Sequence, residues 1–273
     1  MSYATVMVHV DVSAPADARL KIAAEQARRF GARLVGIAAA EPILRVYVGA
    51  PVPAALRLAD EEEAEELLAE AEARFRAAVK DSGCALEWRQ AIGDPTTFVA
   101  RESRAADLLV LGAPRRNDDV DEPAFGADEL TLRAGRPILV VPPEIDRFEG
   151  RRVLVGWKDT PEARRAVADA VPLLAKAEEV IIAAIDEWQE PERTRESASQ
   201  VVVWLGRRGV DSRAVVLPAY GPPASQLDTY AWENGADLIV AGAYGHSRLR
   251  EWALGGVTHD LLHTTRRCSF LSH

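Results

Sequence analysis

The chain has 273 residues, of which 48% are hydrophobic and 27% charged, enough apolar material for one large domain or two ordinary ones. Its net charge of -9 disfavours non-specific binding to nucleic acid, because most of the surface would repel the phosphates. The same charge is compatible with the binding of a small phosphate-bearing ligand. Two cysteines without metal-ligand spacing, no basic leader and no run of about 18 apolar residues indicate a cytoplasmic protein without a membrane span.

Short apolar runs alternate with helical patterns along the whole chain. In the first half we expect strands at 5–10, 33–39, 86–91, 107–112 and 138–141, and helices at 15–30, 60–82, 95–104 and 127–134. In the second half we expect strands at 152–157, 180–185, 213–217, 238–242 and 268–271, and helices at 161–175, 192–208, 223–234 and 257–265. This order predicts an α/β fold of two tandem, open-twisted, five-stranded parallel sheets with helices on both faces.

An internal repeat supports the division into two units. The run Asp107-Leu-Leu-Val-Leu-Gly-Ala113 matches Asp237-Leu-Ile-Val-Ala-Gly-Ala243 almost residue for residue. The repeat predicts a first domain over residues 1–145 and a second over 150–273. A polar junction that opens with two prolines lies between them.

A glycine pattern follows the fourth strand of the second half. Gly242 and Gly245 lie at the strand end, and Gly255 and Gly256 precede the last helical stretch. Glycines at a strand end and a helix start let backbone N–H groups approach an anion closely. The pattern therefore predicts a phosphate-bearing ligand, whereas tight turns in any parallel α/β fold are the alternative.

This glycine spacing, together with the element order, resembles the universal stress protein family. The resemblance covers the whole chain as a tandem of two such domains. It implies the adenine nucleotide alpha hydrolase-like fold, with the fifth strands (138–141 and 268–271) meeting across a pseudo-twofold axis. It also implies a stress-response regulator that binds ATP, usually with Mg²⁺, at the tip of the sheet.

Carried over position by position, the resemblance implies these nucleotide-binding residues in the second half: Trp157, Lys158, Asp159, Ile185, Gly242, Gly245, His246, Arg248, Gly255, Gly256, Val257 and Thr258. Two of them depart from the family pattern. Gly256 stands where a serine or threonine usually helps to hold phosphate, and Lys158 stands where an aspartate usually ends the first strand, with Asp159 as its substitute. Thr258 has two open interpretations, a hydroxyl donor to phosphate or a helix cap.

The first half departs further from the pattern. It keeps the aspartate as Asp11, but Arg115 stands where the second glycine belongs, Pro114 removes a backbone donor, and four acidic residues follow in the loop. We expect no nucleotide there.

No catalytic constellation is evident from spacing, so we expect no dedicated enzyme and at most a weak ATPase. His259 and His263 are four residues apart, a spacing that can bind a metal. Because no third ligand is evident nearby, we interpret them as solvent-facing and expect no metal site. The alternatives to a nucleotide-binding regulator are a nucleotide-free scaffold or interaction protein and a slow adenine-nucleotide hydrolase.

The segment 42–56 is apolar, rich in turn residues and without a counterpart in the second half. An apolar segment of this length must be covered by its own domain or by another chain. We expect the second arrangement, a homodimer contact, alongside a protein partner that the sequence does not identify.

Overall fold

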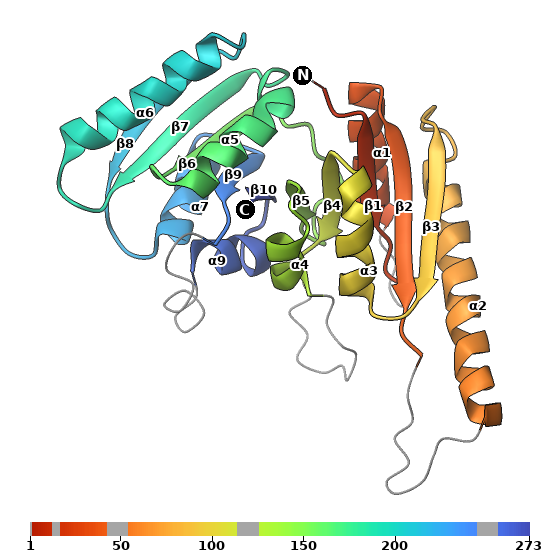
Figure 1. Cartoon of the computed structure of the whole chain (residues 1–273). Coiled ribbons are helices and arrows are strands. Elements are labelled where there is room, and N and C mark those ends of the chain that lie inside the picture. The colour runs from red at the N-terminus through yellow and green to blue at the C-terminus, as the bar shows by residue number, and fades with distance from the viewer. Residues whose placement is uncertain (1, 13–16, 43–53, 114–125, 245–255) are drawn as a thin grey trace, which may run out of the picture.

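The computed structural model describes residues 2–12, 17–42, 54–113, 126–244 and 256–273 (Figure 1). The first half consists of β1 (Thr5–His9), α1 (Asp17–Phe30), β2 (Arg33–Ala40), α2 (Ala54–Val79), β3 (Leu86–Ile92), α3 (Pro95–Glu102), the short η1 (Ser103–Ala105), β4 (Leu108–Gly112), α4 (Ala127–Arg133) and β5 (Ile138–Val141). The second half consists of β6 (Arg152–Trp157), α5 (Pro161–Leu174), β7 (Glu179–Asp186), α6 (Pro191–Gly206), β8 (Arg213–Pro218), α7 (Pro223–Glu233), β9 (Leu238–Gly242), α9 (Val257–His263) and β10 (Cys268–Ser272).

All the predicted strands and helices are present, and the largest difference in bounds is at α2. This helix begins at Ala54 rather than at residue 60, so the last three residues of the segment 42–56 are helical. Residues 43–53 lie outside the described part of the chain, and the homodimer contact expected there stays a prediction.

The two halves share one ten-stranded sheet in the order β3-β2-β1-β4-β5-β10-β9-β6-β7-β8 (Figure 1). Strands are parallel within each half, and the halves join where β5 and β10 pair antiparallel, with Phe270 opposite Leu139. The expected meeting of the fifth strands is therefore confirmed, and it occurs within a single chain.

Helices cover both faces of the sheet. One core cluster contains side chains of α1, α2, α5 and α6, and the other contains side chains of α3, α4, α7 and α9. In β5, Leu139 belongs to the first cluster and its neighbours Ile138 and Val140 to the second. This alternation is the strand period of two, and it explains why the strands read as continuous apolar runs.

The repeated aspartates have matching structural roles. The Asp107 carboxylate accepts hydrogen bonds from the backbone N–H groups of Ala4 (2.8 Å) and Thr5 (2.9 Å), where β1 begins. The Asp237 carboxylate accepts from Gly150 (2.8 Å) and Arg151 (3.3 Å), just before β6. Each aspartate thus fixes the entry of the first strand of its half.

Across the described residues, no helix combines the length and apolar character that a membrane span requires.

Candidate functional site

The candidate site lies where β6 and β9 end. These strands are parallel neighbours, with Val155 opposite Val240 and Gly156 opposite Ala241. Their carboxyl ends therefore bring Trp157 and the residues after it to the same edge of the sheet as Gly242. In doubly wound sheets this edge is where ligands bind.

The segment 242–256, called the glycine segment below, has its two flanks joined by a hydrogen bond, and these joined flanks form its base. The backbone N–H of Tyr244 donates to Thr258 Oγ1 at 3.0 Å, and both residues are buried. Gly256 is the N-cap of α9, with φ -78° and ψ 166°, a conformation open to any residue. The Thr258 hydroxyl thus accepts one backbone hydrogen bond and keeps its own hydrogen for another acceptor. Of the predicted residues, Gly245, His246, Arg248 and Gly255 lie outside the described part of the chain.

Tyr244 adopts a left-handed backbone conformation with φ 50°, which is uncommon for a residue other than glycine. Its side chain is 7% exposed, and its hydroxyl donates to the Asp128 carboxylate of α4 at 2.6 Å. The base of the glycine segment is therefore tied to the first half of the chain.

Gly242 is required by packing. A Cβ on this residue would lie 2.5 Å from Ala163 N and 2.6 Å from Glu162 C, both in the backbone of the first turn of α5. The glycine therefore allows the α5 N-terminus, capped by Thr160, to approach the end of β9. Close packing accounts for this glycine, and it also brings the positive end of a helix dipole to the same edge.

We expect the substitution Gly242→Ala to destabilise the protein by about 1–3 kcal/mol, because backbone atoms of α5 would have to move. Gly206→Ala is the matched control: a Cβ there meets nothing within 4 Å, and alanine at the end of α6 should be neutral or slightly stabilising. Urea denaturation followed by circular dichroism measures both. A Gly242→Ala variant as stable as the parent would contradict the packing role.

The residues after β6 are engaged in polar contacts. Trp157, 8% exposed, donates its indole N–H to Ser197 Oγ at 2.9 Å. Lys158 Nζ pairs with a carboxylate oxygen of Glu187 at 2.7 Å, and Asp159 Oδ1 pairs with Arg164 at 2.5 Å. The lysine that replaces the family aspartate thus lies at the exposed rim, next to a carboxylate that follows β7. Ile185, in β7, is partly buried near the same edge.

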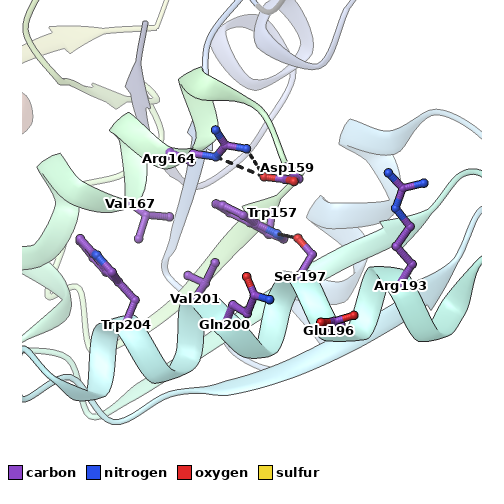
Figure 2. A pocket seen from close by; sticks show the side chains of 10 residues that line it. All are labelled: Trp157, Asp159, Arg164, Val167, Arg193, Glu196, Ser197, Gln200, Val201 and Trp204. Carbon is purple, nitrogen blue, oxygen red and sulfur yellow. Dashed lines mark hydrogen bonds and ion pairs between the residues drawn. The ribbon is translucent and has the colours of Figure 1, made fainter.

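An open pocket of about 640 Å³ lies between α5 and α6 (Figure 2). It contains two of the predicted residues and is lined by Trp157, Asp159, Arg164, Val167, Arg193, Glu196, Ser197, Gln200, Val201 and Trp204. Figure 2 shows the Trp157 side chain extending between the two helices, with the Asp159–Arg164 pair above it. An indole face beside charged groups of both signs fits a planar polar ligand.

The equivalent edge of the first half holds an arginine. Arg19 of α1 is 7% exposed and donates to the Asp11 carboxylate at 2.7 Å. The Arg19 guanidinium also lies directly against Gly112, at the end of β4. Arg74 of α2 donates to the Asp11 carbonyl at 2.9 Å. A buried guanidinium therefore engages Asp11 in the first half, and the expectation that this half binds no nucleotide stays a prediction.

The interpretation of His259 and His263 as solvent-facing, with no third group nearby, is wrong for His263, whose side chain is 26% exposed and contacts Asp128. Asp128 lies against both His259 and His263, although it belongs to the other half of the chain. No sequence signal pointed to it, since 135 residues separate it from His263.

Two α/β repeats of parallel strands share one sheet, with Gly242 at its carboxyl edge, as in tandem proteins of the adenine nucleotide alpha hydrolase-like fold. The family model described as "Universal stress protein family" matches residues 2–120 and 150–267. The chain therefore belongs to the universal stress protein family, with one matching region in each half. No curated protein matches it.

Solved structures agree with this fold. A universal stress protein from Archaeoglobus fulgidus DSM 4304 has a TM-score of 0.72 at 15% identity, covering 97% of this chain and 95% of its own. A functionally unknown protein, PA1789, from Pseudomonas aeruginosa PAO1 has a TM-score of 0.62 at 17% identity, covering 99% and 92%. A putative universal stress protein from Pseudomonas aeruginosa UCBPP-PA14 has a TM-score of 0.63 at 17% identity, covering 99% and 93%.

Proposed function

We propose that the second half of this stress-response protein binds an adenine nucleotide, ATP, at the carboxyl edge of β6 and β9. The observation that carries the proposal is the Tyr244–Thr258 hydrogen bond, which holds the two ends of the glycine segment together beside the end of β6. A segment closed at its base and bounded by glycines suits a backbone nest for phosphate. The adenine base and the accompanying Mg²⁺ are inferred from the resemblance to universal stress proteins that bind nucleotides.

The charges at the rim are compatible with this proposal. Lys158 and Arg164 are each about 60% exposed and pair with carboxylates at the surface. Exposed ion pairs of this kind contribute about 0–1 kcal/mol, so a phosphate group can replace the carboxylate at little cost. Lys158 and Arg164 both lie near Trp157, the last residue of β6, and both can pair with a polyanion.

One specific observation favours a second function, a nucleotide-free interaction protein. Lys158, in the place of the family aspartate, is already paired with Glu187, and a lysine cannot accept a hydrogen bond from ribose or adenine. In that case the glycine segment would retain only its packing role, and the protein would act through a partner surface.

The first experiment separates these two functions. Purified protein is denatured, released small molecules are identified by mass spectrometry, and Mg-ATP binding is measured by calorimetry. We expect about one adenine nucleotide per chain, bound by the second half alone. Gly245→Asp should abolish binding by placing a carboxylate in the nest, while Gly206→Asp, at an open helix position, should leave it intact. A protein that releases no nucleotide and does not respond to millimolar Mg-ATP would exclude ATP binding and leave the nucleotide-free interaction protein as the function.

Gly256→Ser restores the hydroxyl that the family usually has at this place. Since the backbone at Gly256 accepts any residue and serine is a favoured N-cap, the variant should fold at least as stably as the parent. A new hydrogen bond to a charged phosphate oxygen should tighten ATP binding by about tenfold. Calorimetry measures the change, and an unaltered dissociation constant would show that residue 256 does not face the phosphates.

A further inference from the structure

Two histidines and a carboxylate from opposite halves of the chain converge beside Tyr244. His263 Nε2 lies 2.8 Å from Asp128 Oδ2, and His259 Nδ1 lies 3.6 Å from Asp128 Oδ1. The two imidazole rings stack with their centroids 4.1 Å apart. One ligand atom from each residue can be chosen so that all three lie within 4.8 Å of one another.

We propose that Asp128, His259 and His263 bind a divalent transition-metal ion of the Zn²⁺ class, which bridges α4 of the first half and α9 of the second. Two imidazoles and one carboxylate form a common three-ligand set of open zinc sites, in which water completes the coordination. Imidazole ligands suit Zn²⁺, Cu²⁺ and Ni²⁺, whereas Mg²⁺ prefers oxygen ligands. This site is therefore distinct from that of a Mg²⁺ ion carried by ATP.

The distances fit such an ion. Ligand atoms about 2.0–2.2 Å from a tetrahedral Zn²⁺ lie roughly 3.3 Å from one another. His263 Nε2 lies 2.8 Å from Asp128 Oδ2, and one ligand atom of each residue can be chosen with all three within 4.8 Å, so side-chain rotations bring the set to this separation. The side chains of His259, Asp128 and His263 are 52%, 38% and 26% exposed, which gives an ion and its water ligand a path from solvent.

A second residue orients the carboxylate. The Tyr244 hydroxyl donates to Asp128 Oδ1 at 2.6 Å, which leaves Oδ2 directed at His263. Partners of this kind fix the orientation of metal ligands, and their loss typically costs 10–100-fold in affinity. Because Tyr244 directly precedes Gly245, an ion at Asp128 would also be linked to the base of the glycine segment.

The alternative is a plain His–Asp hydrogen-bonded cluster between α4 and α9. Such a cluster needs no ion, and its imidazoles would serve only the contact between the two helices. The two arrangements differ in what a metal titration of the intact protein shows.

The test uses untagged, metal-free protein without nucleotide, so its outcome is independent of the nucleotide proposal. Co²⁺ is added and the visible absorption bands recorded, Zn²⁺ is used to displace it, and Zn²⁺ stoichiometry is measured by calorimetry. We expect one Zn²⁺ per chain and the intense bands of low-symmetry Co²⁺. His263→Gln and Asp128→Asn should each weaken Zn²⁺ binding at least tenfold, and Tyr244→Phe about tenfold.

Glu129→Gln is the matched control. Glu129 is the next carboxylate on α4 and forms an ion pair with Arg133, so its loss should leave Zn²⁺ affinity unchanged. Thermal unfolding without metal verifies that each variant folds. The absence of stoichiometric Zn²⁺ binding to the parent, or parental affinity in a folded His263→Gln variant, would overturn the proposal.

Discussion

Replacing Phe270 with alanine is expected to lower the free energy of unfolding by about 3–5 kcal/mol. The Phe270 side chain is fully buried in β10, at the centre of the ten-stranded sheet. It lies opposite Leu139 of β5, the strand through which the first half joins the second, and both side chains belong to the same core cluster. The loss therefore includes the transfer free energy of the ring and the cavity left at the junction.

Urea denaturation followed by circular dichroism measures this loss. Val203→Ala provides the control: Val203 lies on α6 and is 57% exposed, so its truncation should change stability by less than about 0.5 kcal/mol. If the halves form one cooperative unit, the Phe270→Ala variant should unfold in a single transition shifted to lower urea. A loss below about 1 kcal/mol would mean that the junction relaxes around the missing ring.

The fold was predictable from sequence because its signals are local. Runs such as 108–112 and 238–242 are continuously apolar, which indicates strands buried on both faces. The repeated aspartates before these runs helped to align the two halves, and the structure shows why both are present: each accepts backbone hydrogen bonds at the entry of a first strand. The meeting of β5 and β10 was expected only from the family resemblance, because the residues of a strand do not specify which strand it pairs with, and the structure adds that the pairing is antiparallel.

The candidate site was less predictable, because its contacts join residues far apart in the chain. The sequence marked Gly242 as part of a phosphate loop, whereas the structure adds a packing requirement set by the α5 backbone. Arg19 stood unremarked within a helical pattern, yet it is buried against Asp11. His259 and His263 were noted for their spacing, but the third group, Asp128, comes from the opposite half.

His9 is a buried histidine whose pKa makes the stability of the protein depend on pH. It lies in β1, 4% exposed, with its Nδ1 atom 3.3 Å from Asp11 Oδ1. Burial is the main cause that lowers the pKa of His9 from 6.5 to about 4; nearby Asp11 raises it, and Arg19 lowers it further. The folded protein therefore holds a neutral imidazole at pH values where the unfolded chain is protonated.

This difference predicts that His9 makes the protein sensitive to acid. Its stabilising contribution is complete above the unfolded pKa of 6.5 and is lost as the pH falls from 6.5 to about 4, because only the unfolded chain binds the proton in that interval. A shift of this size corresponds to a loss on the order of 3 kcal/mol. We expect a His9→Gln variant, which carries no titrating group there, to lose that much less stability than the parent between pH 7 and pH 4. Urea denaturation of both proteins across this interval measures the difference, and parallel stability curves would show that the burial of His9 does not govern acid unfolding.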